Sequence, residues 1–167
     1  DVSLYLTESL ADSRFVARRI GTIFSLLCAS PAYLEKYGEP KSLDDLQKHA
    51  CLRLVNPSIT PQWHLVSENS CSYQIDITGQ LIADTPELLL DMVQQDMGIA
   101  LLPTFAVIEA VRTGRLRRVL ADWRSPDIGV YTLLPSRHFI DAKTRAWLTW
   151  VEQHISPKIQ SDTDYFL

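Results

Sequence analysis

Cysteine and histidine are scarce in this sequence of 167 residues, which contains three of the former and four of the latter. The cysteines, Cys28, Cys51 and Cys71, are an odd number at wide and irregular spacings, which fits neither a disulfide framework nor a C-x-x-C metal or redox motif. The histidines are dispersed without the spacing of zinc ligands. We therefore predict no metal, no cofactor and no disulfide.

Catalytic signatures and long apolar runs are also missing. The sequence contains no G-x-S-x-G, P-loop or G-x-G-x-x-G motif. No stretch approaches the roughly 20 apolar residues of a membrane span. Residues 1–8 lack the basic and then apolar pattern of a signal peptide. These absences predict a protein that is not an enzyme, does not enter a membrane and works in the cytoplasm.

Basic residues do not outnumber acidic ones, and the formal net charge is -4. Without a global positive field, this chain has no evident means of attracting nucleic acid. Arginines gather between residues 112 and 118, after a predicted helix, and we interpret them as a solvated face. With 46% hydrophobic and 22% charged residues, the chain can bury the core of one domain or of two small lobes.

The first thirty residues carry strand signals. Residues 2–7 alternate between apolar and polar side chains, which predicts a half-buried strand. Because the sequence opens inside this strand, we expect that part of the native domain precedes Asp1. Residues 14–20 alternate again, and residues 23–29 form an apolar run typical of a strand buried on both faces.

Helix and strand signals then mix. Residues 30–38 predict a short helix, with serine as the N-cap, proline at the first helical position and glycine as the stop. Residues 42–45 form a capping-box pattern that predicts a second helix. Strands are predicted at residues 52–55, 63–66 and 73–83, separated by segments rich in polar residues and proline.

The next segment repeats a helix followed by a strand. Thr85 caps a helix that ends at a glycine and leads into a buried strand at residues 99–102. Thr104 caps a second helix at residues 105–113, which is followed by a strand-like segment at residues 116–120. Alternating helices and strands place the fold in the α/β class.

The C-terminal part of the chain is predicted to form one strand and one helix. Residues 128–134 read as a strand, after a loop signal at residues 122–126. A helix is predicted at residues 141–155, with Trp147 and Trp150 on or beside its apolar stripe and Pro157 as its stop. The polar tail beyond Pro157 is expected to fray or to pack weakly.

Several segments together resemble one known family, the effector-binding domains of LysR-type transcriptional regulators. In chain order, these segments are residues 1–6 (DVSLYL), residues 15–21 (FVARRIG), residues 29–34 (ASPAYL) with Gly38 and Pro40, then Leu43, Asp45, Leu46 and His49, and residues 98–103 (GIALLP). Each segment alone is a weak signal. Their order and separation make the resemblance fairly specific, and it extends to about His154.

The resemblance implies an α/β fold of two Rossmann-like lobes joined by two crossing strands, as in type II periplasmic binding proteins. Residues 1–28 would belong to lobe I, residues 29–124 to lobe II, residues 125–156 would return to lobe I, and residues 157–167 would form a tail. It also implies that lobe I is N-terminally truncated, because its first β-α-β unit and the winged helix-turn-helix before it do not occur in the sequence. DNA would be bound only through that absent N-terminal domain.

A small-molecule effector would lie between the lobes, where strand ends and helix N-termini gather. The residues predicted to contact the effector are Thr7, Glu8, Ser9, Ser30, Thr85, Pro86, Thr104 and Phe105. Simple helix capping explains Thr85 and Thr104 equally well, and Ser30 is a structural cap first. The helix starts favour an anion while Glu8 disfavours one, and on balance we favour a small carboxylate or a polar metabolite.

Sensor domains of this family usually pair, so the resemblance also implies a homodimer or a homotetramer. Its interface would use Val107, Ile108, Val111 and Leu116. Only part of the helix can enter the core of its own lobe, so a remaining apolar strip is expected to be exposed. The alternative function is a free solute-binding protein of the same fold for transport. A redox role for Cys28 is disfavoured, because it lies inside a buried apolar run.

Overall fold

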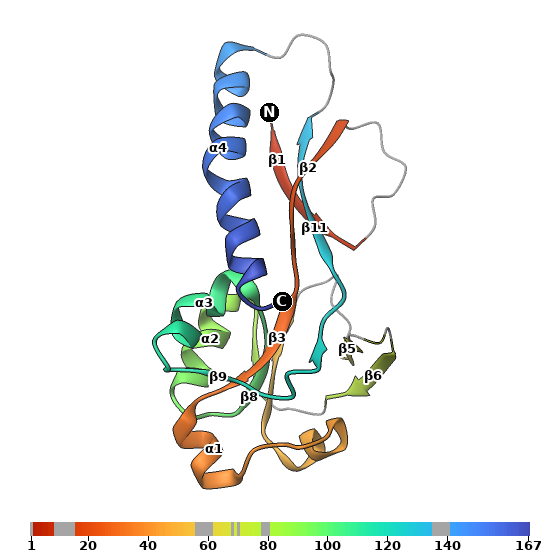
Figure 1. Cartoon of the computed structure of the whole chain (residues 1–167), viewed down its shortest axis with the longest axis vertical. Coiled ribbons are helices and arrows are strands. Elements are labelled where there is room, and N and C mark those ends of the chain that lie inside the picture. The colour runs from red at the N-terminus through yellow and green to blue at the C-terminus, as the bar shows by residue number, and fades with distance from the viewer. Residues whose placement is uncertain are drawn as a thin grey trace. The chain divides into compact units, whose positions relative to one another are not determined.

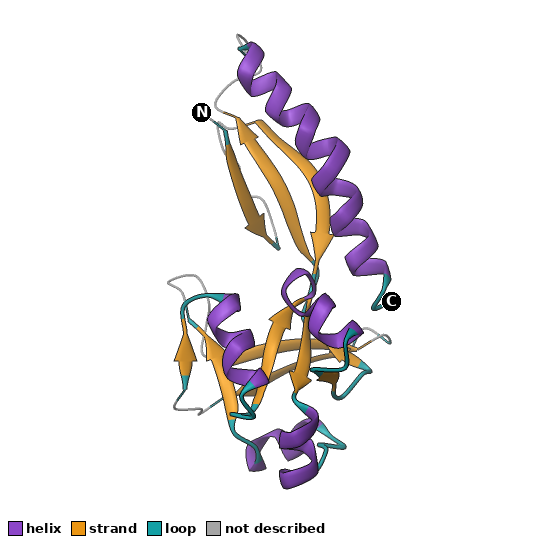
Figure 2. Ribbon diagram, turned by 90° about the vertical axis from the view of Figure 1, so that its left-hand side faces the viewer, coloured by secondary structure: helices purple, strands orange, loops and turns teal. Residues whose placement is uncertain are grey.

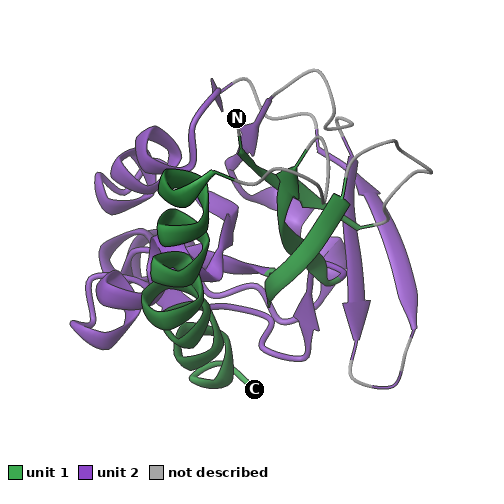
Figure 3. Cartoon of the chain, turned by 90° about the horizontal axis from the view of Figure 1, so that it is seen from above, with its two compact units in different colours: residues 1–24, 127–167 green, residues 25–126 purple. Residues whose placement is uncertain are grey.

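The computed structural model describes residues 2–8, 16–55, 62–67, 69, 71–77, 81–134 and 141–167. The chain divides into two compact units, one made of residues 1–24 and 127–167 and the other of residues 25–126 (Figure 3). The polypeptide therefore passes between the units twice, after Phe24 and after Pro126. The sequence placed these crossings a few residues away, at 28/29 and 124/125.

The first unit is a three-stranded antiparallel sheet with one long helix along it (Figures 1 and 2). Strand β11 (Ile128–Leu134) is central and pairs with β1 (Ser3–Thr7) on one side and with β2 (Val16–Ile23) on the other. Helix α4 (Ala142–Asp164) packs on β2. A small core of Ile20, Ile23, Val130 and Val151 holds the layers together.

Helix α4 does not end where the sequence predicts, because Pro157 lies inside it and the helix continues to Asp164. The supposed tail is docked: the Thr163 hydroxyl donates to the Thr22 carbonyl at 2.9 Å, and Ile159 packs against the core. Proline removes one helical hydrogen bond. These tertiary contacts beyond the proline supply stabilisation that local sequence rules cannot register.

Two burial predictions for this unit are also wrong. Leu4 and Leu6 of β1 are half exposed, and helix α4 packs on β2 rather than on this edge strand. On α4, Val151 is buried and Trp147 is partly buried, whereas Trp150 is 51% exposed and stacks on the His154 ring at 5.0 Å.

The second unit contains a mixed sheet with the strand order β6-β5-β10-β3-β8-β4-β7, and β9 pairs separately with β3. Its central strands are β3 (Ser25–Ala29) and β8 (Ile99–Pro103), which are antiparallel and largely buried. Strand β4 (Cys51–Leu54) runs parallel to β8 on one side and to β7 (Ile82–Ala83) on the other. The predicted α/β class is therefore confirmed in this unit.

Several predicted strands have different limits in the structure. The strand predicted at residues 73–83 is two strands, β6 (Ser72–Asp76) and β7, and the segment at residues 116–120 shortens to β9 (Arg117–Arg118). The residues read as a loop include β10 (Trp123–Arg124), which is antiparallel to β3 and to β5 (Gln62–Ser67). Short strands of this kind carry too few residues for a periodic signal.

Local capping chemistry determines the first helix of this unit. Helix α1 (Pro31–Tyr37) begins after Ser30, whose side chain accepts from the Tyr33 amide at 3.1 Å, and ends at Gly38 with φ of 87°. The predicted helix after Ser42 is a single 3-10 segment, η1 (Leu43–Lys48), and the Asp45 carboxylate accepts from the Ser42 amide at 3.1 Å.

Helices α2 (Pro86–Gln94) and α3 (Thr104–Arg112) follow β7 and β8 and pack on the sheet. Their fully buried residues include Leu89 and Val93 in α2 and Val107 in α3. Only glycine fits at position 98, just before β8. A Cβ at this position would lie 2.2 Å from the Ala50 carbonyl oxygen, and Gly98 has a φ of +154°. The close approach aligns β8 with β4.

Candidate functional site

The candidate site lies at one edge of the second unit's sheet, where β7, β4 and β8 end. These strands are parallel, so their carboxyl ends share that edge. Two residues separate the end of β7 from the start of helix α2, and helix α3 starts immediately after β8. Both helices therefore direct the free amides and the positive dipole end of their first turns to the same edge, which flanks the end of β4.

Thr85 forms the N-cap of α2, as predicted. Its Oγ1 accepts from the Leu88 amide at 3.3 Å, and the residue is exposed. Pro86 occupies the first helical position, where its missing N–H costs nothing. The Thr85 hydroxyl keeps its own proton, which remains available to a ligand oxygen.

Thr104 does not cap α3, which corrects the prediction. Pro103 occupies the N-cap position without a side-chain hydrogen bond, and Thr104 is the first residue of the helix. Thr104 is 0% exposed, and its Oγ1 has no hydrogen-bond partner among the described residues. The first turn of α3 therefore keeps uncapped amides, and a buried hydroxyl beside them is unsatisfied. Phe105, the next residue, is 43% exposed.

The sequence reasoning missed three polar residues near this edge. Ser25, which is paired with Pro103, donates its amide to the Ser125 hydroxyl at 2.8 Å, and Ser125 donates in turn to the Pro126 carbonyl at 2.9 Å. Arg53 lies on β4, and its Nε is buried without a hydrogen-bond partner. In the sequence, Arg53 is simply a polar residue in an alternating strand, so no local signal distinguishes it.

The structure does not bring every predicted contact to this edge. Ser30 lies beyond the opposite end of the sheet, because β3 runs antiparallel to β8, and its hydroxyl donates to the Asp96 carboxylate at 2.5 Å. Thr7 is the last residue of β1 and pairs with Gly129 in the first unit, where Glu8 is exposed. Ser9 lies outside the described residues.

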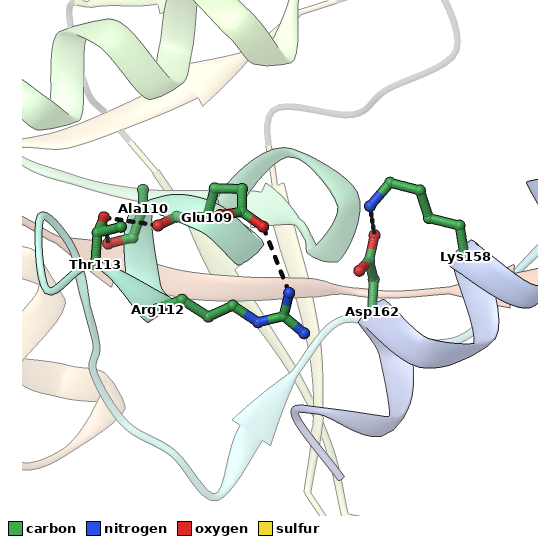
Figure 4. Close-up of polar contacts among 6 residues, drawn as sticks. All are labelled: Glu109, Ala110, Arg112, Thr113, Lys158 and Asp162. Atoms are coloured by element: carbon green, nitrogen blue, oxygen red, sulfur yellow. Dashed lines mark hydrogen bonds and ion pairs between the residues drawn. The ribbon is translucent and has the colours of Figure 1, made fainter.

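The predicted interface residues are mostly interior. Val107, Ile108 and Leu116 are buried in the second unit, so of the predicted residues only Val111, which is half-buried, can contribute to an exposed strip. The exposed side of α3 is instead partly charged. Arg112 lies beside Glu109 (Figure 4). Its Nη1 is 3.4 Å from the Glu109 Oε1, and the Thr113 hydroxyl donates to the Glu109 carbonyl at 2.7 Å.

Burial disfavours nucleophilic chemistry at two of the three cysteines, Cys28 and Cys51. Burial raises the pKa of Cys28 to about 12, against an opposing effect of Arg118, and burial raises the pKa of Cys51 to about 12. Both thiols therefore stay protonated and unreactive at neutral pH. Within the described ranges, no group of His, Cys, Asp and Glu side chains could hold a metal ion. No helix in those ranges is long and apolar enough to cross a membrane.

A mixed α/β sheet with two helix starts at one strand edge is an arrangement typical of domains that bind small ligands. A family model described as the LysR substrate binding domain matches residues 1–156. The chain belongs to that family.

Curated relatives and solved structures agree with the assignment. An HTH-type transcriptional regulator of Xanthomonas campestris is 29% identical over 95% of this chain and 46% of its own length. The uncharacterised regulator YhjC of Escherichia coli is 30% identical over 87% of this chain and 49% of its own. The chain thus spans about half the length of the curated relatives it matches.

Two solved structures share the fold. The full-length Vibrio cholerae virulence activator AphB, described as a member of the LTTR family, matches with a TM-score of 0.81, 25% identity, and coverage of 92% of this chain and 52% of that one. The regulatory domain of CrgA from Neisseria meningitidis, a LysR-type regulator, matches with a TM-score of 0.77, 25% identity, and coverage of 90% and 74%. The predicted family and its fold class are confirmed.

Proposed function

We propose that this chain is the ligand-sensing part of a bacterial LysR-type transcription regulator, and that a small effector contacts the carboxyl edge of β7, β4 and β8. The observation that carries the proposal is the convergence of the α2 and α3 starts on that edge in a chain of this family. Ligands of open α/β sheets collect at such edges. The alternative of a free solute-binding protein is not favoured, because the matched relatives are named as transcriptional regulators.

The uncapped start of α3 and the unsatisfied Thr104 hydroxyl support this position for the effector. Buried polar groups are nearly always hydrogen-bonded, and a ligand oxygen would satisfy both features. Thr85, on the other side of β4, would add a second hydroxyl. The predicted contacts of Pro86 and Phe105, and those of Thr7, Glu8 and Ser9 in the first unit, remain predictions, as does a position of the effector between the lobes.

Calorimetry on the full-length regulator with its effector tests the site. Thr85→Val and Thr104→Val should each weaken effector binding by about 1 kcal/mol or more, because each removes a hydrogen bond to the ligand. Thr113→Val, at the far end of α3, is the matched control and should leave affinity unchanged, since its hydroxyl bonds to the helix itself. Unchanged affinity in both test variants would refute the site.

The regulator would sense the effector here and bind DNA elsewhere in the protein, in the cytoplasm and without acting as an enzyme. The net charge of -4 supports this separation, because phosphate contacts dominate DNA affinity. Effector should change operator binding by the full-length protein in gel-shift assays. Sequence-specific binding at sub-micromolar concentration and physiological salt by residues 1–167 alone would contradict the proposal.

Assembly into a homodimer or a homotetramer would use the exposed side of α3, with Phe105 and Val111 as its apolar contacts. Val111→Lys should shift the intact protein toward monomer in sedimentation experiments while leaving its fold intact. Val107→Lys is the informative contrast, because Val107 is fully buried and its replacement should unfold the unit instead. A dimer that Val111→Lys leaves unchanged would place the partner elsewhere.

A further inference from the structure

Arg53 is unusual among the arginines of this chain. Its Nε is buried and makes no hydrogen bond, as is also true of Arg118. The Arg118 guanidinium, however, donates through Nη2 to the Ala121 carbonyl, whereas no hydrogen bond or ion pair joins the Arg53 guanidinium to any described residue. Every other described arginine has a partner; for example, Arg18 pairs with Glu152, Arg117 with Glu39 and Arg115 with Gln94. A charged N–H group that is removed from water without a partner destabilises a fold, so such a group calls for an explanation.

The position of Arg53 in the sheet explains why its Nε lacks a partner. It lies on β4, the strand between β7 and β8, so the starts of α2 and α3 follow the strands on either side of it. Leu52 pairs with Ala100, which places Arg53 level with Leu101 and about three residue steps, roughly 10 Å, before the level of Thr104. A long arginine side chain can cover much of that distance toward the carboxyl edge.

The unsatisfied groups around this edge are all hydrogen-bond donors or can act as donors. The Arg53 Nε and the first-turn amides of α3 are donors, and the buried Thr104 hydroxyl can donate as well. Acidic side chains do not neutralise them: Asp84 and Glu87, next to the start of α2, are exposed, and neither forms an ion pair with Arg53. An acceptor with negative charge would satisfy all of these groups together.

We propose that Arg53 binds a carboxylate group of the effector at this edge and so determines the class of molecule that the domain senses. The guanidinium fork matches the two oxygens of a carboxylate, and the α3 amides and Thr104 would receive the same group or a neighbouring oxygen. This inference rests on the proposed sensing function. It adds the charge of the ligand and the residue that selects it, neither of which follows from family membership.

A stability measurement separates this role from a structural one without any ligand. Arg53→Met keeps the apolar stem and removes the unsatisfied group, so the ligand-free full-length protein should melt at the same temperature or up to roughly 2–4 °C higher. Sites kept ready for a ligand commonly sacrifice stability in this way. A clear fall in melting temperature, or failure to fold, would mean that Arg53 holds the structure together, and would overturn the proposal.

Binding is tested by calorimetry on the full-length protein with acetate, succinate and benzoate, each compared with its neutral amide, and with inorganic phosphate and sulfate as separate arms. At least one carboxylate should bind the wild type, while its amide should not. Arg53→Gln should weaken that carboxylate at least tenfold, and Arg53→Lys should weaken it less. Arg19→Gln is the matched control: Arg19 is an exposed strand arginine that bonds to Thr22, and its replacement should change nothing.

The other possible results of the binding experiment also decide whether Arg53 binds a carboxylate. Failure of every carboxylate to bind, binding by phosphate or sulfate only, or equal carboxylate affinity of wild type and Arg53→Gln would overturn the proposal. The sensing function is scored separately, by effector-dependent operator binding. A neutral or cationic compound that changes operator binding would leave that function standing and would refute the carboxylate assignment alone.

Discussion

Replacing Gly21 by alanine is expected to separate strand β2 from the C-terminal half of α4. A Cβ added at Gly21 would lie 2.6 Å from Cγ2 of Ile159, which is too short for two carbon atoms, and 3.2 Å from its Cβ, which is a tight contact. Cγ2 is attached to the branched Cβ of Ile159, so it cannot move aside without a change of rotamer or a shift of the helix.

Two opposing effects determine how much Gly21→Ala changes the free energy of unfolding. Overpacking of this kind destabilises by about 1–3 kcal/mol, whereas alanine in place of glycine stabilises by about 0.4–1 kcal/mol through the unfolded chain. The clash should dominate, and the net loss should be about 1–2 kcal/mol. For a domain of this size, that loss lowers the melting temperature by roughly 2–8 °C.

Denaturant unfolding measures the loss, and hydrogen exchange of the amides at residues 157–164 locates it. Ile159→Ala supplies the control, because it removes Cγ2, so Gly21→Ala should cost clearly less in that background than in the wild type. Contacting pairs typically show coupling of about 0.5–3 kcal/mol. Full additivity, or unchanged exchange in the helix, would refute the docking of α4 on β2 beyond Pro157.

Three further predictions concern the second unit. Ser30→Ala should lower the free energy of unfolding by about 1–2 kcal/mol, because it removes the cap on the Tyr33 amide and the bond to Asp96. Burial lowers the pKa of His49, so its contribution to stability is present above the unfolded value of about 6.5 and is lost as pH falls through the lower folded value; NMR titration should find that folded pKa below 6.5. Burial raises the pKa of the Cys28 thiol to about 12, so in the native protein it should resist alkylation at pH 8.

Each of these three predictions can be contradicted by a specific result. A stable Ser30→Ala variant would mean that α1 is fixed by packing alone. A His49 that titrates above 6.5 would contradict its burial beside the Tyr33 hydroxyl, 3.1 Å from Nδ1. Rapid alkylation of Cys28 under native conditions would show that β3 opens.

The sequence predicts best where local chemistry decides the structure. Helix α1 has its serine cap, its proline and its terminal glycine within nine consecutive residues, so each rule acts at short range. The same is true of Thr85 at the start of α2. Family membership could also be predicted, because the resembling segments keep their order along almost the whole chain.

Long-range contacts account for the errors. Pro157 is a sound stop signal locally, yet Thr163 bonds to Thr22, which is far away in the sequence and holds the helix beyond the proline. Thr104 fits the pattern of an N-cap, but the strand extends through Pro103 and shifts the helix start by one residue. Arg53 carries no signal at all, because only the paired strands show that its Nε is buried and unsatisfied.

The two edges of the second unit's sheet differ in how fully their polar groups are hydrogen-bonded. At the edge where β4 and β8 begin, Ser30 bonds to Asp96 and thereby holds a residue with φ of 61°. The Tyr33 hydroxyl at this edge accepts from the Ala50 amide at 3.0 Å.

At the edge where the same strands end, Arg53 and Thr104 keep unsatisfied groups and α3 lacks a cap. Polar groups that are satisfied internally stabilise a fold, whereas unsatisfied ones lower its stability until a ligand arrives. Substitutions at the first edge should therefore change stability with little effect on affinity. Substitutions of Arg53 and Thr104 at the second should change affinity while stability stays level or rises, and this opposition distinguishes a binding role from a structural one before any effector has been identified.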